Sequence, residues 1–241
     1  MMFLKAVSAA RLEGVVTTDL ALYLSAHDPD SYSGTGATVN DISTNDNHAT
    51  LTNGVTYSSS NGGYFELDAV NDFLTDDATT GTPFGFGTGA FTYEHWLYLD
   101  SASRLQVLFD ARRRDANANN FNGADLVDSD GKYKVYYNTS FAFQATSFTF
   151  SANTWYHVVC SRTSTSTNQT RLYVNNELKH TGTLTSSFVD YGYYYWGRNV
   201  NPVGATYYDG RVAQMRVYKG RGLSAAEVTQ NWNAHRRLYG L

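Results

Sequence analysis

The chain has 241 residues, a formal net charge of −4, and 42% hydrophobic and 15% aromatic residues, which together exclude a disordered chain. The acidic balance argues against a general nucleic-acid binder, which needs a basic surface to displace counterions from phosphates. Charged residues make up only 17% of the chain, and its polarity comes from Ser, Thr, Asn, Gly and 19 Tyr, a composition that favours strands and turns.

Residues 1–17 form a segment of their own. Phe3, Leu4 and Val7 approximate one helical face and predict an arm that docks on a larger assembly, with a disordered or edge-strand terminus as the alternative. The segment is a poor signal peptide, because a lysine interrupts its apolar run. We therefore expect a protein that begins in the cytoplasm where it is made. The predicted organisation is an arm over 1–17 and a single domain over 18–241.

From residue 19 onward, short strand-like runs alternate with turn-forming clusters. The predicted strands cover residues 20–24, 64–67, 73–74, 91–99, 105–109, 126–127, 133–137, 155–162, 171–174, 177–179, 193–196 and 211–218. Alternation within 91–99 places His95 on one face and Glu94 and Trp96 on the other. A polar stretch over 25–63 contains no predicted strand. Many short strands with few helical windows indicate an all-β protein, a two-sheet antiparallel sandwich.

Two hairpins and one helix have local signals. Asp130-Gly131 and Asn175-Asn176 each separate two strand-like runs, and Asp-Gly suits the positive φ angles of a type I′ turn. Ser224 can cap a helix, and Glu227 stands at the position that closes a capping box. The apolar stripe that follows predicts a short amphipathic C-terminal helix docked against one sheet or its rim.

Several segments carry a family likeness. They are residues 39–51, the strand 65–74, the strand 91–97, Trp155-Tyr156-His157-Val158, Leu172-Tyr173-Val174-Asn175-Asn176, and residues 208–227. In order and spacing they resemble the concanavalin A-like lectin/glucanase group, in its laminin-G-like jelly-roll branch, over roughly residues 19–240. The resemblance implies a two-sheet jelly roll. The chain departs from the family pattern at Ala69, where Gly is usual, and at Asn175-Asn176, where Asp-Gly is usual.

The group includes lectins, calcium-dependent protein binders, glycoside hydrolases and modules of phage and bacterial surface proteins, so the fold alone does not fix the function. Its hydrolases carry closely spaced carboxylates on one strand, because a retaining glycosidase needs two carboxyl groups about 5 Å apart. Here Glu66 has only Asp68 at that spacing, in a structural position of the family. Asp128 and Asp130 fall at a predicted turn. We therefore predict no catalytic residues and no enzymatic activity.

The tyrosine-rich stretch 191–199 is the strongest ligand-binding candidate. A strand here places Tyr193 and Tyr195 on one face and the neighbouring rings on the other. The outward face would offer rings for sugar stacking or protein contact, and plain sheet packing is the alternative. The predicted ligand-binding residues are Tyr193, Tyr195, Arg198, Asn199 and Tyr207.

The loop 110–125 contains two weaker candidate binding features. The loop 110–125 supplies carboxylate and amide oxygens, which Ca²⁺ prefers, and Asp115, Asn117 and Asn119 are its candidate ligands, with simple turn formation as the alternative. No other cofactor is predicted. The basic run 112–114 is either a solvated loop or a contact for an acidic partner or sugar acid.

The sequence predicts a non-catalytic phage virion protein. It would be a capsid decoration, knob or fibre module that binds a neighbouring virion protein or a host glycan, with neither nucleic acid nor membrane insertion involved. Such a protein is made in the host cytoplasm and displayed on the virion surface, and homo-oligomers would suit this role. The alternatives are a free, extracellular carbohydrate-binding lectin and a polysaccharide-active hydrolase.

Overall fold

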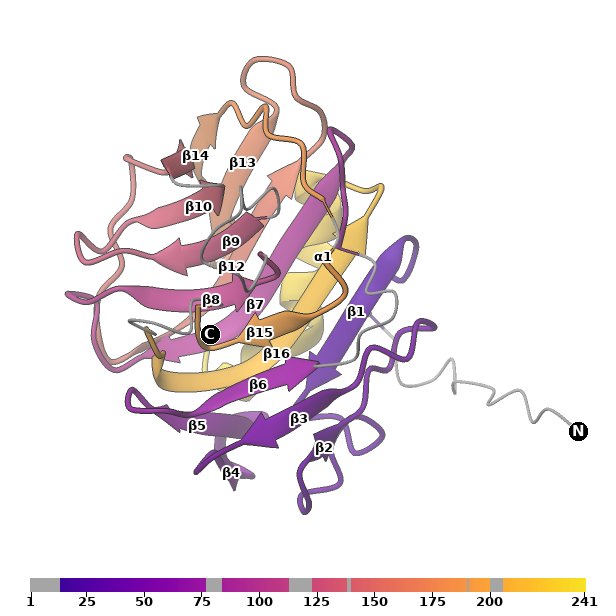
Figure 1. Ribbon diagram of the computed structural model, residues 1–241, viewed down its shortest axis with the longest axis vertical. Coiled ribbons are helices and arrows are strands. Elements are labelled where there is room, and N and C mark those ends of the chain that lie inside the picture. The colour runs from indigo at the N-terminus through magenta and orange to yellow at the C-terminus, as the bar shows by residue number, and fades with distance from the viewer. Residues whose placement is uncertain (1–13, 77–83, 113–122, 138–139, 190, 200–205) are drawn as a thin grey trace, which may run out of the picture.

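The computed structural model describes residues 14–76, 84–112, 123–137, 140–189, 191–199 and 206–241. Its strands form two antiparallel sheets, which confirms the all-β sandwich (Figure 1). Sheet A has the order β14-β13-β12-β7-β16-β5-β4, with β1 also paired to β16. Sheet B has the order β11-β10-β9-β8-β15-β6-β3-β2.

The bounds of the elements are as follows. Sheet A contains β1 (Leu20–Ser25), β4 (Thr56–Ser58), β5 (Tyr64–Asp68), β7 (Phe91–Leu99), β12 (Thr154–Arg162), β13 (Thr170–Val174), β14 (Glu177–Gly182) and β16 (Asp209–Lys219). Sheet B contains β2 (Thr38–Val39), β3 (Ala49–Thr52), β6 (Phe73–Asp76), β8 (Gln106–Asp110), β9 (Gly123–Val127), β10 (Tyr133–Tyr137), β11 (Ser140–Gln144) and β15 (Tyr194–Trp196). The helices are η1 (Ser60–Gly62), α1 (Ala225–His235) and η2 (Arg236–Tyr239).

An aromatic core fills the space between the sheets. Its largest members are the fully buried rings of Phe65, Phe84, Phe91, Tyr93, Tyr133, Tyr194, Trp196 and Tyr208. Each fully buried large apolar side chain contributes roughly 1.5–3 kcal/mol to folding. The alternation predicted for residues 91–99 is present in β7, because Tyr93 lies in this core while Trp96 lies in a separate cluster beneath the C-terminal segment.

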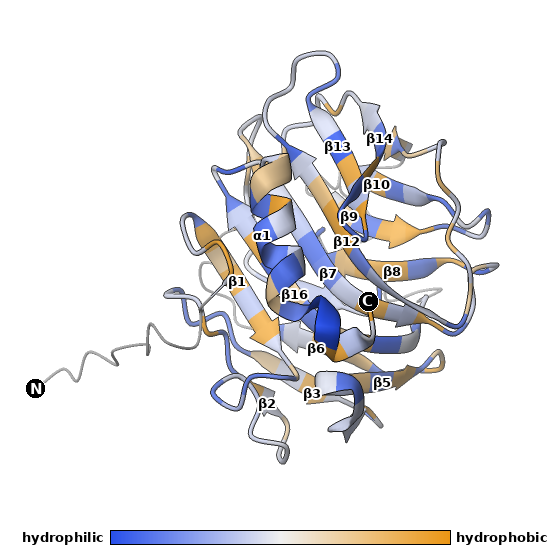
Figure 2. Ribbon diagram, turned by 180° about the vertical axis from the view of Figure 1, so that it is seen from behind, coloured by the Kyte–Doolittle hydropathy of each residue, from blue (hydrophilic) through white to orange (hydrophobic). Residues whose placement is uncertain are grey.

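Helix α1 covers the outer face of sheet A, as Figure 2 shows. The predicted capping box between Ser224 and Glu227 is present. Trp232 of α1 and Tyr239 of η2 both stack on Trp96, with ring centroids 5.4 and 4.5 Å away. These contacts attach the C-terminal segment to the sheet. No described helix is both long and apolar enough to span a bilayer.

A buried polar network, formed by Glu94, His157, Gln214, Arg216 and Asn231, lies between sheet A and α1. Oε1 of Glu94 accepts hydrogen bonds from Nε2 of His157 (2.7 Å) and Nη2 of Arg216 (2.7 Å). Its Oε2 accepts from the side-chain amide of Asn231 on α1 (2.8 Å). Burying a charge without partners is costly, so these contacts are what allow Glu94 to lie beneath the helix.

Residues 14–17 of the predicted arm pack on the domain. Val15 and Val16 are buried, and the backbone N–H of Val16 donates to Asn231 (2.8 Å). The predicted arm residues Phe3, Leu4 and Val7 lie outside the described residues.

The two predicted hairpins use different turns. Asn175 and Asn176 have φ angles of 50° and 65°, as a type I′ turn requires. At the β9–β10 turn only Gly131 has a positive φ, and its N–H donates to the carbonyl of Asp128. A type I′ turn centred on Asp130-Gly131 was therefore the wrong expectation, because the loop includes the two residues before this pair.

Ala69 adopts a left-handed backbone conformation, with φ of 66°. A side chain there costs roughly 1–2 kcal/mol, so Ala69→Gly is expected to raise the free energy of unfolding by about 0.5–1 kcal/mol after the extra flexibility of glycine is subtracted. Urea denaturation measures this change. The matched control, Ala226→Gly in the exposed first turn of α1, is expected to lower the free energy of unfolding by up to about 1 kcal/mol, the cost of glycine in a helix interior. A loss of stability in both variants would contradict the prediction.

Candidate functional site

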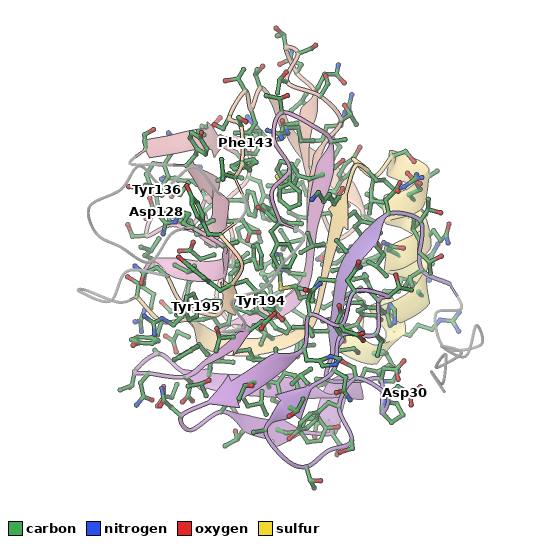
Figure 3. All side chains as sticks on the ribbon, turned by 45° about the vertical axis from the view of Figure 1, so that its right-hand side comes forward. Asp30, Asp128, Tyr136, Phe143, Tyr194 and Tyr195 are labelled. Atoms are coloured by element: carbon green, nitrogen blue, oxygen red, sulfur yellow. The ribbon has the colours of Figure 1, made fainter. Side chains whose placement is uncertain are left out.

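One row of residues crosses the outer face of sheet B. Directly opposite residues in antiparallel strands point to the same side of the sheet. The pairings place Thr50, Thr75, Tyr195, Asp110, Ala124, Tyr136 and Phe141 in one continuous row. In the described part of the chain no helix covers this face, in contrast to sheet A. The side chains of Tyr195 and Tyr136 are labelled in Figure 3.

The structure brings three sequence-predicted tyrosines together. Phe73, Tyr193, Tyr195 and Tyr207 form a cluster, called here the aromatic cluster. The ring of Tyr195 lies 5.6 Å from that of Phe73 and 6.2 Å from that of Tyr193, and Tyr207 lies 6.4 Å from Phe73. Phe73 and Tyr195 are buried, whereas Tyr193 and Tyr207 are only partly covered. Stacking surface for a ligand therefore comes chiefly from Tyr193 and Tyr207.

Alternation along β15 explains why these rings face outward. Tyr194 and Trp196 point into the core, where both are fully buried, so Tyr195 points the other way. Gly197 then follows with φ of 90°, and a Cβ at that position would collide with the side chain of Leu67. Only glycine combines this backbone conformation with so close an approach. The chain therefore turns at Gly197, which brings Arg198 back over the aromatic cluster.

The Arg198 guanidinium lies over three rings. Its Cζ is 4.7 Å from the ring centroid of Phe73, 4.9 Å from that of Tyr195 and 5.4 Å from that of Tyr207. Such cation–π contacts hold the guanidinium in place. Asn199 plays a supporting part, because its carbonyl accepts from Nε of Arg198 (2.9 Å) and its side-chain oxygen accepts from the N–H of Thr206 (3.0 Å).

A second group of side chains continues the row toward β10. Arg112 forms a two-pronged ion pair with Asp110, with N–O distances of 2.6 and 3.0 Å, and its Cζ lies 4.6 Å from the ring of Tyr136. The side chain of Arg112 therefore bridges the short Ala124 in the middle of the row. Arg112 is buried, so the solvated-loop alternative is wrong for this residue, whereas Arg113 and Arg114 lie outside the described residues.

The acidic pair at the β9–β10 turn shares one lysine. Nζ of Lys134 lies 2.6 Å from Asp128 and 3.0 Å from Asp130. Partial burial opposes ionisation of Asp128, but the hydrogen bond from Lys134 outweighs it and holds the pKa of this carboxyl below its ordinary value. Both carboxylates therefore have a structural role in the turn, where they share the ion pair with Lys134, as their position in the predicted turn before Gly131 indicates.

The other closely spaced pair, Glu66 and Asp68, also has structural partners. Asp68 accepts hydrogen bonds from the N–H groups of Val70 and Asn71, and these bonds lower the pKa of its carboxyl. Glu66 lies 3.5 Å from Arg211. Asp68 therefore shapes the turn after β5, in the structural position that the family likeness implied.

The candidate calcium ligands Asp115, Asn117 and Asn119 lie outside the described residues. Within the described ranges, no group of three or more His, Cys, Asp or Glu side chains is arranged to hold a metal ion.

Sequence reasoning missed two parts of this face. Phe73 belongs to the aromatic cluster, and Tyr136 supports Arg112. Nothing local marks Phe73, since it lies more than a hundred residues before Tyr195 in the chain. Tyr136 was predicted only as part of a strand, and its alternation with buried Val135 was the available signal that it faces outward.

A family and several solved structures are similar to this chain. The family described as the concanavalin A-like lectin/glucanases superfamily matches residues 59–229. The sialidase of Trypanosoma rangeli, solved in complex with sialic acid, is 16% identical with a TM-score of 0.66, over 93% of this chain and 34% of that chain. A search of the curated proteins found no match.

Two structures of the binding domain of botulinum neurotoxin DC are similar as well. The complex with rat synaptotagmin II is 12% identical with a TM-score of 0.67, over 91% of this chain and 52% of that chain. The complex with SialylT is 12% identical with a TM-score of 0.65, over 90% of this chain and 52% of that chain. This chain thus spans about a third of the sialidase and about half of the toxin chains. At these identities the likeness shows a shared fold.

Proposed function

The chain belongs to the concanavalin A-like lectin/glucanases superfamily, and from this premise we propose that it is a recognition protein that binds carbohydrate on the outer face of sheet B. The aromatic cluster is the observation that carries the proposal. Partly covered tyrosine rings offer flat apolar faces on which sugar rings can stack. The toxin domain solved with SialylT supports a glycan as the class of ligand.

The ligand on this face is an oligosaccharide rather than a single sugar, because partly exposed rings stand at both ends of the row: Tyr193 and Tyr207 beside the buried Tyr195, and Tyr136 and Phe141 at the other end. Tyr195 on β15 and Tyr136 on β10 are separated by β8 and β9 in one row. Three strand spacings correspond to about 14 Å, a length that needs several linked sugars. Phe141 continues the row onto β11 and is partly exposed.

Loss of a stacking ring tests this function. Tyr193→Ala or Tyr207→Ala is expected to weaken binding to the glycan selected on an array up to about tenfold, because an aromatic contact contributes roughly 0.5–1.5 kcal/mol. Titration calorimetry with the full chain measures the affinity. The control is Tyr57→Ala, which replaces a half-covered tyrosine on β4 of sheet A. If the array shows no glycan binding, or if all three variants bind like the wild type, the proposed function is wrong.

We propose further that this recognition is non-catalytic. The acidic pairs at the β9–β10 turn and at the end of β5 have the spacing seen in hydrolases. Asp128 and Asp130 form ion pairs with Lys134, and Asp68 of the Glu66–Asp68 pair accepts a backbone hydrogen bond in the turn after β5. Incubation with a polysaccharide panel is therefore expected to release no reducing ends. Release that is lost on Asp128→Asn would establish the hydrolase instead.

The proposed setting is the surface of a phage virion, where the domain binds a host glycan or a neighbouring virion protein. The composition is rich in Tyr, Asn, Ser, Thr and Gly and low in charge, which suits an exposed particle protein. Deleting residues 1–13 is expected to abolish incorporation into particles, since the arm would provide the attachment. The domain is expected to remain folded, because the deletion keeps residues 14–16, which pack on it. Undiminished incorporation of the truncated protein would contradict an attachment arm.

A further inference from the structure

Arg198 differs from Arg112 and Lys134, the other cations that the structure describes over the outer face of sheet B. Arg112 is paired with Asp110, and Lys134 is shared by two aspartates of the β9–β10 turn. In the described part of the chain no carboxylate lies within ion-pair distance of Arg198, and only its Nε has a hydrogen-bond acceptor, the carbonyl of Asn199. The two Nη groups therefore retain N–H donors for a ligand.

The surroundings of Arg198 prepare it for an anion. Rings of Phe73, Tyr195 and Tyr207 surround the guanidinium, so it is partly shielded from water and held in one orientation. An ion pair is stronger where water is partly excluded, and a side chain already held in place loses little further entropy on binding. A guanidinium presents parallel N–H groups that match the two oxygens of a carboxylate.

We propose that the ligand of the aromatic cluster is an acidic glycan whose sugar carboxylate binds to the Nη groups of Arg198. This inference rests on the proposed carbohydrate-binding function and names the chemical class of its ligand. Hexuronates and sialic acids both carry such a carboxylate next to a sugar ring. The ring stacks on Tyr193 or Tyr207 while the carboxylate pairs with Arg198. A neutral sugar in the same place leaves the guanidinium partly desolvated and unpaired, so the site discriminates against it.

Two matched pairs of probes test the proposal by calorimetry on the full chain. They are trigalacturonate with its methyl ester, and sialyllactose with the methyl ester of its sialic acid. In at least one pair, the acidic member is expected to bind about 10- to 100-fold more tightly than the neutral one, because a hydrogen bond to a charged group contributes roughly 1.5–3 kcal/mol. The pair that shows the difference identifies the source of the carboxylate. The preference should weaken at high salt.

Variants assign the preference to Arg198. Arg198→Gln is expected to abolish the acid-over-neutral ratio, and Arg198→Lys to retain part of it, since lysine keeps the charge but not the paired donors. Arg104→Gln is the control, because Arg104 is partly exposed and paired with Asp209. Circular dichroism checks that each variant is folded.

The possible failures are distinguishable. Equal binding of acidic and neutral probes, or an unchanged ratio in Arg198→Gln, overturns the acidic ligand but leaves carbohydrate binding intact. The same holds if the array selects only neutral glycans and none of the four probes binds. If the array selects no glycan at all, both the acidic ligand and the proposed function are wrong.

Discussion

Replacing Arg216 with methionine is expected to lower the free energy of unfolding by about 3–5 kcal/mol, the cost of leaving a buried charge without its partner. Arg216 and Glu94 are both 1% exposed, and their side chains lie 2.7 Å apart. Burial opposes the charge on Glu94, but Arg216 and the hydrogen bond from His157 outweigh it and hold the pKa of this carboxyl far below its ordinary value. The loss of Arg216 therefore leaves the Glu94 carboxylate buried beneath α1 without its cationic partner. Urea denaturation measures the change.

Two further variants separate this effect from general damage. Arg211→Met lies on the same strand, but its partner Glu66 and its own side chain are partly exposed, so a loss below about 1 kcal/mol is expected. Adding Glu94→Gln to Arg216→Met should recover part of the stability, because it removes the unpaired charge. Equal effects of Arg211→Met and Arg216→Met, or no recovery in the double variant, would show that the buried pair does not govern stability.

Acid is expected to destabilise the protein from about pH 6.5 downward, beginning with His235 at the end of α1. Burial and, to a smaller extent, the positive charge of Arg216 together lower the pKa of His235 from 6.5 to about 3, although Glu94 acts in the opposite sense. Between these pH values the unfolded chain binds a proton that the folded chain does not, so stability is lost as the pH falls. The full loss from this residue is on the order of 4 kcal/mol by pH 3.

Other groups around His235 act in the same direction. Burial also lowers the pKa of His157, despite its bond to Glu94, and Nδ1 of His157 has no acceptor or donor in the described residues. A neutral imidazole that donates from Nε2 fits this arrangement. The lowered pKa of Glu94 adds a loss below about pH 4.5, the ordinary value for glutamate. Tyr23 and His27 also face His235, with Tyr23 Oη 3.5 Å from its Nε2 and the His27 ring 6.3 Å away.

Thermal unfolding of His235→Gln between pH 7.5 and 4.5 tests this assignment. The variant should lose less stability on acidification than the wild type. His180→Gln on edge strand β14 is the control, since His180 is less buried and its contribution is smaller. Parallel pH profiles of His235→Gln and the wild type would contradict a role for His235.

Parts of the fold were predictable because their signals are local. The period-two pattern of residues 91–99 assigned both faces of β7, and the capping box placed the start of α1 at Ser224. Strands β2, β3 and β4 were missed within the polar stretch 25–63, and β11 was missed as well. These strands are short, and most of their residues are at least partly exposed, so they carry little hydrophobic alternation.

The candidate site likewise has a part that local sequence predicts and a part that depends on strand pairing. Alternation predicted that Tyr193 and Tyr195 share a face, because this depends only on neighbouring residues. The position of Phe73 beside them follows from the pairing of β6 with β15, which joins residues about 120 positions apart. The burial of Arg112 on Tyr136 likewise depends on strand pairing.

By itself the sequence determined the β-sandwich class, the family likeness, the turn at Asn175-Asn176 and the alternation within single strands, since each arises from residues close together in the chain. Only the tertiary structure decided which charged side chains lie within ion-pair distance of an opposite charge. Lys134 forms ion pairs with Asp128 and Asp130, and Arg216 pairs with Glu94, more than a hundred residues away in the chain. Arg198 instead lies over aromatic rings. Ion pairing acts over a few ångströms of space, whereas sequence patterns record separation along the chain.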